Sequence, residues 1–168
     1  MALIKKFIIK DHQKIEPLVQ LKNISVFYNK RQIISNLNLS INRNEILGML
    51  GPNGVGKSTI FNLITGLKEV DHGEIIIDGI NSTNLPINER FTEFKLGLVP
   101  QHGGVIHDLT LKDNLKLVAE IHIKEKNLIE QKINKLISQF EFESILNIKA
   151  KHLSGGQKKK LVIAMALI

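Results

Sequence analysis

The sequence lacks cysteine and tryptophan, and aromatic residues make up only 5% of its 168 positions. Without cysteine, the chain forms no disulfide and no cysteine-ligated metal centre. It also lacks any apolar run close to the roughly 18 residues that a membrane-spanning helix needs. Residues 1–16 mix charged and short apolar pieces, which is not the pattern of a signal peptide. With 43% hydrophobic residues, the composition predicts a soluble, cytosolic chain with one core.

A net charge of +7 would suit a nucleic-acid or membrane-surface partner. The lysines are spread along the chain, however, and the tightest cluster is Lys158–Lys160 on an expected helix. The few aromatic residues offer little surface on which bases could stack. We therefore expect a solvated or lipid-proximal basic face, and no nucleic-acid partner.

What the sequence does contain is a glycine-rich loop with the spacing G-x-x-x-x-G-K-S/T, set between the apolar run Ile46–Leu50 and a helical pattern at Ser58–Gly66. Its glycines permit backbone N–H groups to approach a polyphosphate closely. Lys57 would place a positive charge on the outer phosphates, and Ser58 would offer a hydroxyl to Mg²⁺. The predicted nucleotide-binding residues are Gly51, Pro52, Asn53, Gly54, Val55, Gly56, Lys57, Ser58 and Thr59.

The first half of the sequence favours strands around this loop. The pattern over Leu18–Ile41 predicts antiparallel strands with a turn near Asn29, and Gly73–Gly79 predicts a short strand that ends in an Asp-Gly turn. The run Ile46–Leu50 shows no alternation, which predicts a strand buried on both faces. A small helix is expected from Pro86 to Phe94.

The second half favours helices. Thr110 and Asp113 have the spacing of a capping box before a helix that reaches about His122, and apolar residues recur with a helical period over 128–140. Farther on, Leu153-Ser154-Gly155-Gly156-Gln157 places an N-cap serine and two glycines before a helix. By itself this motif fits an ordinary helix cap as well as a second anion-binding helix N-terminus.

The phosphate-binding loop followed by Leu153, Ser154, Gly155, Gly156 and Gln157 resembles the ABC transporter ATPase family, over about residues 18–168. The resemblance implies an α/β fold: a P-loop NTPase core with an N-terminal antiparallel β subdomain and a helical insert. It implies ATP and Mg²⁺ as cofactors. It also implies that this pentapeptide, the signature, reaches the γ-phosphate of ATP held by the second subunit of a head-to-tail homodimer. Integral membrane subunits at the inner face of the cytoplasmic membrane are the other implied partners.

Two further residues match family positions. Tyr28 corresponds to the aromatic residue that stacks on adenine, although the sequence alone marks it only as a sheet residue. Gln101 corresponds to the catalytic-site glutamine that contacts Mg²⁺ and the attacking water. Without the resemblance, Gln101 would be an ordinary loop amide.

The family organisation divides the sequence into an N-terminal extension (1–16), a P-loop core with the β subdomain (17–100), a glutamine loop with the helical subdomain (101–152), and the signature with its helix (153–168). The reaction implied is phosphoryl transfer to water, in which the protein positions groups and neutralises charge.

The family's Mg²⁺-binding carboxylate, catalytic glutamate and switch histidine are expected beyond Ile168. The stretch Ile75–Asp78 is a poor substitute for the carboxylate strand, because it precedes the signature and continues into a turn. We therefore expect the chain to be C-terminally incomplete, to bind nucleotide weakly and to show negligible turnover by itself.

Within the family, residues 79–101 and 109–115 resemble the ATPase of the lipopolysaccharide export transporter. The same stretches occur more loosely in ATPases of branched-chain amino-acid importers. A soluble ABC protein that acts on nucleic acid or ribosomes stays open, and so does a protein that senses ATP without hydrolysing it.

Overall fold

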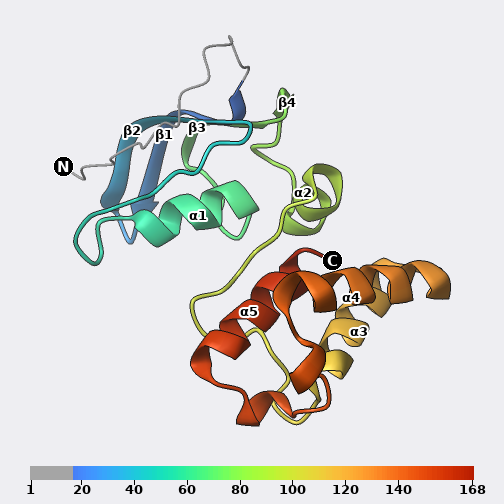
Figure 1. Ribbon diagram of the computed structural model, residues 1–168. Helices are drawn as coiled ribbons and strands as arrows, with labels where there is room; N and C mark the ends of the chain where they lie inside the picture. The colour runs from blue at the N-terminus through green and yellow to red at the C-terminus, as the bar shows by residue number, and fades with distance from the viewer. Residues whose placement is uncertain (1–16) are drawn as a thin grey trace. The chain divides into compact units, whose positions relative to one another are not determined.

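The computed structural model describes residues 17–168, so the extension predicted at 1–16 lies outside the described residues. Contacts divide the chain between Leu96 and Gly97 into two compact units, here called unit 1 and unit 2 (Figure 1). Unit 1 holds a β-sheet and two helices, and unit 2 is helical.

The sheet of unit 1 has the strand order β2-β1-β3-β4. β1 (Pro17–Tyr28) and β2 (Arg31–Asn42) form a long antiparallel hairpin. β3 (His72–Ile77) pairs antiparallel with the other edge of β1, and the short β4 (Ile80–Asn81) follows it. The antiparallel strands predicted for this half of the sequence are present.

Two tight turns fix the register of these hairpins. Asn29 and Lys30, with φ of 46° and 66°, join β1 to β2, and Asp78 and Gly79, with φ of 50° and 77°, join β3 to β4. Consecutive residues with positive φ match the twist of the flanking strands. The Asp78 carboxylate forms an ion pair with Arg43. Asp78 therefore lies in the turn that the sequence predicts.

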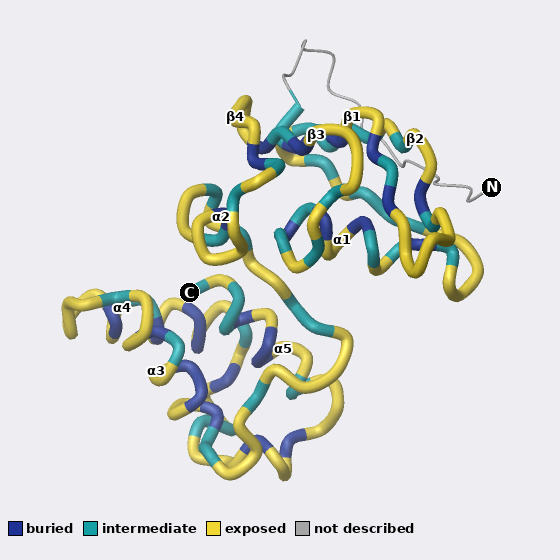
Figure 2. The backbone as a smooth tube through the Cα atoms, turned by 180° about the vertical axis from the view of Figure 1, so that it is seen from behind, coloured by how far each residue is buried: buried dark blue, intermediate teal, exposed yellow. Residues whose placement is uncertain are grey.

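The core of unit 1 lies between the sheet and α1 (Lys57–Thr65), both of which carry buried stretches (dark blue in Figure 2). α2 (Ile87–Phe94) follows, at the helix expected after Pro86. Each fully buried aliphatic side chain contributes about 1.5–3 kcal/mol to folding. The members with the least exposure are Leu21, Ile24, Val26, Leu63, Ile75 and Ile77.

The segment before the glycine-rich loop differs from the prediction. Ile46–Leu50 forms no strand, and the side chains of Ile46 and Leu50 are 77% and 57% exposed. The prediction of a strand buried on both faces is therefore wrong for this structure. Such a strand needs hydrogen-bonded neighbours on both edges, and the sheet of unit 1 is built from other segments.

Unit 2 contains the helices that the sequence predicts. α3 (Leu111–His122), α4 (Lys126–Phe140) and α5 (Gly155–Ala166) pack around one apolar core. Among the helices of the described chain, none is both long and apolar enough to cross a bilayer. The most deeply buried core residues are Leu111, Leu115, Ala119, Leu136, Phe142, Ala150, Leu161 and Ala164.

The start of α3 shows the expected cap. Thr110 Oγ1 accepts a hydrogen bond from the Asp113 backbone N–H at 3.1 Å and donates one to Asp113 Oδ2 at 2.6 Å. The acidic side chain thus lies in the first turn, where the helix dipole favours negative charge.

Candidate functional site

The N-terminus of α1 is open at the predicted phosphate-binding loop. Gly56 is the N-cap residue, with φ of 102° and ψ of 7°, and no side chain caps the helix. The first intrahelical hydrogen bond runs from the Ile60 N–H to the Gly56 carbonyl at 3.0 Å. The N–H groups of residues 57–59 therefore have no partner inside the helix. Together with the positive end of the helix dipole, they would favour an anion at this helix end.

Gly56 also joins this loop to the sheet. A Cβ atom at this buried position would lie 3.4 Å from Ile34 Cγ1 and 3.5 Å from Ile33 Cγ2, which is ordinary contact. The constraint on the residue is instead the positive φ, which glycine adopts more readily than any other residue. The loop is thus held against β2, close to the end of the β1–β2 hairpin.

The Lys57 side chain bridges the two ends of the loop. Its Nζ donates hydrogen bonds to the carbonyl oxygens of Gly51 at 2.6 Å and Pro52 at 2.7 Å. An ammonium group carries three donors, so one N–H remains for an anion beside the helix N-terminus. This geometry fits the charge role that the sequence predicts for Lys57.

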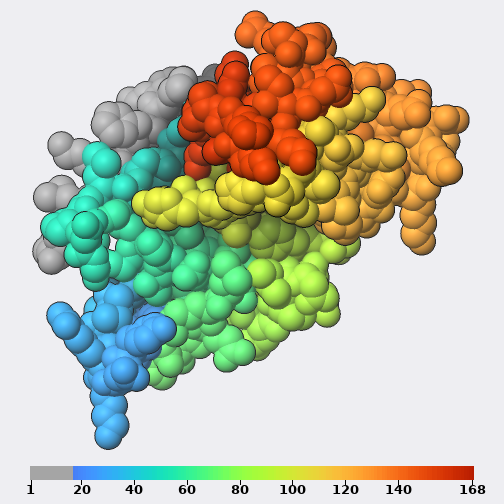
Figure 3. All heavy atoms as spheres, turned by 90° about the horizontal axis from the view of Figure 1, so that it is seen from below, coloured from blue at the N-terminus to red at the C-terminus, as the bar shows by residue number. Residues whose placement is uncertain are grey.

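Tyr28 ends β1 in the same unit and is 63% exposed. Figure 3 shows atoms of this hairpin end (blue) protruding from the surface of unit 1. Tyr28 pairs across the hairpin with Arg31. The ammonium of Lys68 lies 5.1 Å from the centroid of its ring. An exposed aromatic ring therefore stands on the same hairpin that contacts the phosphate-binding loop.

The signature in unit 2 forms a complete capping box. Ser154 Oγ accepts from the Gln157 N–H at 3.2 Å, and Gln157 Oε1 accepts from the Ser154 N–H at 2.8 Å. A Cβ atom at Gly155 or Gly156 would meet no heavy atom within 4 Å. Leu153 is buried and anchors the motif in the core. The two glycines therefore begin α5 with an open backbone.

Gln101 lies in unit 2 and lines one pocket with Gly155. Lys159 and Pro100 also line this pocket, and Lys159 Nζ donates to the Pro100 carbonyl at 3.0 Å. The structure thus brings Gln101 to the signature helix within unit 2, while Tyr28 and the phosphate-binding loop share unit 1. The remaining lining residues are His102, Gly103, Val105, His107, Lys158 and Val162.

Arg90 was not predicted and is the largest polar side chain in the core, at 2% exposure. Its guanidinium donates to carbonyl oxygens of Leu63 and Ile64 in the last turn of α1, and to those of Thr83 and Leu85. Burial lowers the pKa of Arg90. It adds a donor to carbonyls in the last turn of α1, of which Leu63 also accepts from the Gly66 N–H at 3.3 Å, and it complements the negative end of the helix dipole. The spacing of apolar residues gives no signal for a buried arginine.

Asn114 is a second unpredicted residue, fully buried at the start of α3. Its Oδ1 accepts from the Ile106 N–H at 2.8 Å, and its Nδ2 donates to the Ile106 carbonyl at 3.1 Å and the Thr110 carbonyl at 2.9 Å. One amide thus fixes the connection that leads from the Gln101 loop into α3.

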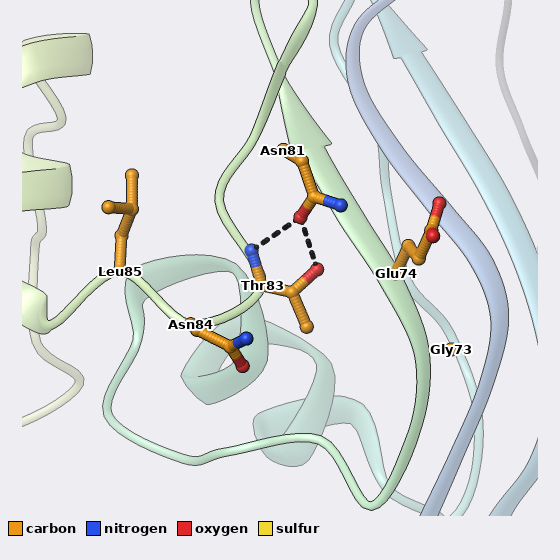
Figure 4. Close-up of a pocket in the computed structure, with 6 residues that line it drawn as sticks. All are labelled: Gly73, Glu74, Asn81, Thr83, Asn84 and Leu85. Atoms are coloured by element: carbon orange, nitrogen blue, oxygen red, sulfur yellow. Dashed lines mark hydrogen bonds between the residues drawn. The ribbon is translucent and has the colours of Figure 1, made fainter.

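A polar hollow in unit 1 lies apart from the predicted site residues (Figure 4). There Asn81 Oδ1 accepts hydrogen bonds from the backbone N–H of Thr83 at 3.1 Å and from its hydroxyl at 2.7 Å. The polar groups of Asn81 and Thr83 are therefore hydrogen-bonded to each other. We interpret the hollow as part of a local turn and not as a ligand site. Across residues 17–168, no three His, Cys, Asp or Glu side chains are grouped to hold a metal ion.

A glycine-rich loop that opens a helix beside a β-sheet defines a P-loop nucleotide-binding protein. The model of the ABC transporter family matches residues 34–168, and the chain belongs to that family. The resemblance drawn from the phosphate-binding loop and the signature is thereby confirmed.

Curated relatives include transporter ATP-binding proteins of different kinds. The chain is 37% identical over 150 residues to the lipopolysaccharide export system ATP-binding protein LptB of Haemophilus influenzae, covering 87% of this chain and 61% of that protein. It is 33% identical over 149 residues to the spermidine/putrescine import ATP-binding protein PotA of Thermotoga maritima, covering 89% and 39%. It is 36% identical over 146 residues to an uncharacterized ABC transporter ATP-binding protein of Rhizobium meliloti, covering 87% and 54%. The chain thus spans 39% to 61% of these relatives' lengths.

Solved structures confirm the predicted fold class. The ADP conformation of an ATP-binding cassette of an ABC transporter matches with a TM-score of 0.81 at 26% identity, covering 90% of this chain and 65% of that chain. A dimeric post-hydrolysis cassette bound to ADP and Pi matches with a TM-score of 0.73 at 30% identity, covering 89% and 68%. The chain is therefore an α/β P-loop ATPase core with an antiparallel β subdomain and a helical region.

Proposed function

We propose that this chain is the nucleotide-binding part of an ABC transporter ATPase subunit, which couples ATP binding and hydrolysis to transport. The observation that carries the proposal is the open N-terminus of α1, with Gly56 as the cap and the Lys57 ammonium on the Gly51 and Pro52 carbonyls of the same loop. The family membership supports ATP as the ligand.

The phosphates of ATP would lie against the N–H groups of residues 57–59, with Lys57 neutralising the outer phosphates. Ser58 and Gln101 would provide oxygen ligands to the Mg²⁺ that accompanies ATP. Their oxygen atoms suit this ion, which prefers oxygen ligands, and both side chains are exposed. When bound, Mg²⁺ neutralises charge on the transferred phosphoryl group.

Gln101 would hold the attacking water, and Tyr28 would stack on the adenine ring. The signature residues Ser154–Gln157 would reach ATP on a second, head-to-tail copy of the subunit, with the N–H groups of Gly155 and Gly156 as donors, because those of Ser154 and Gln157 are used in the capping box. The matching structure of a dimeric cassette with ADP and Pi supports such an arrangement. Neither copy would then hold a complete site.

For the transported substrate we propose lipopolysaccharide, exported with integral membrane subunits at the inner face of the cytoplasmic membrane. The 37% identity to LptB supports this choice. The similarity to the spermidine/putrescine import protein at 33% identity supports the alternative of an importer, and the branched-chain amino-acid type rests on the sequence resemblance alone. ATPase activity of the full-length complex that rises with lipopolysaccharide, and not with amino acids, would favour export.

Nucleotide binding by the chain tests the core of the proposal. Isothermal titration with MgATP should give weak binding that Lys57→Ala reduces about ten-fold or more, since a charged hydrogen bond is lost. Lys112→Ala removes an exposed lysine from α3 and should leave the affinity unchanged. Equal affinities for the two variants would overturn the proposed phosphate site.

We expect negligible steady-state hydrolysis by residues 1–168 alone, and measurable turnover would contradict that expectation.

A further inference from the structure

The environment of Tyr28 is more ordered than its exposure suggests. An aromatic side chain that is 63% exposed at a hairpin end has little packing to fix its rotamer. Here the Lys68 ammonium lies over the ring, 5.1 Å from its centroid. A cation at this distance is attracted to the ring face. One face of Tyr28 is therefore occupied by a neighbouring side chain.

The segment that carries Lys68 is fastened at both ends. The Lys68 N–H donates to the Asn62 carbonyl of α1 at 3.0 Å. Farther along, Asp71 Oδ2 accepts from the Phe27 N–H, one residue before Tyr28, at 2.8 Å. The ammonium is thus set over the ring by a backbone that is anchored to α1 and to β1.

This segment connects the two halves of the proposed nucleotide site. The N-terminus of α1 would face the phosphates, and the chain that leaves its C-terminus soon reaches Lys68, whose ammonium lies over the ring of Tyr28 in β1. An aromatic ring has two faces, and the Lys68 ammonium lies over only one of them. The 63% exposure of Tyr28 shows that much of the residue is open to solvent and accessible to a stacked base.

We propose that Lys68 is a positioning residue for nucleobase binding: its ammonium holds the Tyr28 ring so that the opposite face receives the adenine of ATP. This inference rests on the proposed function. Lys68 lies outside both the phosphate-binding loop and the signature. It would determine how much the adenine base contributes to the affinity for ATP.

A comparison of ATP with inorganic triphosphate isolates that contribution, because the two ligands share the phosphate contacts. Lys68→Met removes the cation and keeps the length of the side chain. It should weaken ATP binding about two- to five-fold, the factor expected for an exposed cation–ring contact, and leave triphosphate binding unchanged. Lys68→Arg should restore the affinity for ATP. Lys124→Met is the matched control, because it removes the charge of an exposed lysine in unit 2. It should change neither the affinity for ATP nor the affinity for triphosphate.

The chain offers a direct readout of the ring, since Tyr28 is its only tyrosine and it has no tryptophan. Intrinsic fluorescence anisotropy therefore reports Tyr28 alone, and Lys68→Met should lower this anisotropy.

An unchanged ratio of ATP to triphosphate affinity, or an equal loss for both ligands, would overturn the role of Lys68. Tyr28→Ala separates the two proposals: if it lowers the ratio while Lys68→Met does not, only the role of Lys68 fails. If Tyr28→Ala leaves the ratio unchanged, the proposed stacking fails and the role of Lys68 fails with it.

Discussion

Arg90 donates a hydrogen bond from Nη1 to the carbonyl oxygen of Leu63, in the last turn of the helix whose other end forms the phosphate-binding loop. The same guanidinium reaches Ile64 and the segment before α2. The acceptors are neutral carbonyl oxygens, so the charge is stabilised by peptide dipoles. A short helix with an open N-terminus is thereby held at its C-terminus by a cation from another element.

Arg90→Met should destabilise unit 1 strongly. It removes the guanidinium donors from the part-buried carbonyls of Ile64, Thr83 and Leu85, while Leu63 keeps the Gly66 N–H, and the expected loss in unfolding free energy is about 2–4 kcal/mol. Urea denaturation monitored by circular dichroism measures this loss in unfolding free energy. Arg43→Met removes an arginine from an exposed ion pair and should cost less than about 1 kcal/mol. Equal midpoints for the two variants would show that the buried contacts of Arg90 contribute little.

Gly56→Ala should disturb the loop through its backbone rather than through crowding. At φ of 102° a Cβ atom meets only ordinary contacts, but a non-glycine residue with positive φ is strained by about 1–2 kcal/mol. We expect lower stability and weaker MgATP binding, measured by denaturation and titration. Gly48→Ala is the control, because its Cβ would meet nothing within 4 Å and its φ is not in the left-handed region. If the control were as damaging as Gly56→Ala, backbone strain would not be the cause.

Ser154→Ala should cost about 1 kcal/mol of stability, the usual effect of removing an N-cap hydroxyl. It abolishes one of the two reciprocal hydrogen bonds at the start of α5. Ser138→Ala changes an exposed serine inside α4 and should be neutral or slightly stabilising, because alanine favours the helix. Thermal unfolding of both variants checks the expectation, which would be contradicted by similar midpoints.

The pair of Asp108 and Lys151 should make a small, pH-dependent contribution. A hydrogen bond of 2.9 Å from Lys151 lowers the pKa of Asp108 in the folded state. The pair therefore stabilises the fold above the unfolded-state pKa, and this contribution is lost as the pH falls through the lower, folded-state pKa. Urea denaturation of the wild type and Asp108→Asn between about pH 3 and about pH 7 should show a difference that shrinks in acid. A constant difference would contradict the linkage.

The local features of this fold could be read from the sequence because short-range interactions determine them. The hairpin turn at Asn29, the helix after Lys57 and the N-cap at Ser154 each depend on residues within a few positions. The strand predicted at Ile46–Leu50 depends on partners elsewhere in a sheet, and an apolar run by itself does not supply them. Arg90 escaped prediction for the same reason, because two of the carbonyls that it contacts, those of Leu63 and Ile64, are distant in the sequence.

The candidate site divides in a similar way. The glycines of the phosphate-binding loop and the N-cap serine of the signature could be identified from residue type and spacing in the sequence. The roles of Tyr28 and Gln101 were inferred from family resemblance and stay predictions. The contact of Lys68 with Tyr28 joins residues far apart in the sequence, so no local pattern could have indicated it.

The capping box at the start of α5 determines which substitutions the signature should tolerate in a mutational scan. The side chains of Ser154 and Gln157 each accept a hydrogen bond from the backbone N–H of the other residue. Exchanges that keep the cap, such as Ser154→Thr, should therefore be tolerated. Alanine at Gly155 or Gly156 would meet no steric obstacle in this chain and would favour the helix. Selection against alanine at these glycines would therefore come from a molecule that approaches α5 from outside the chain.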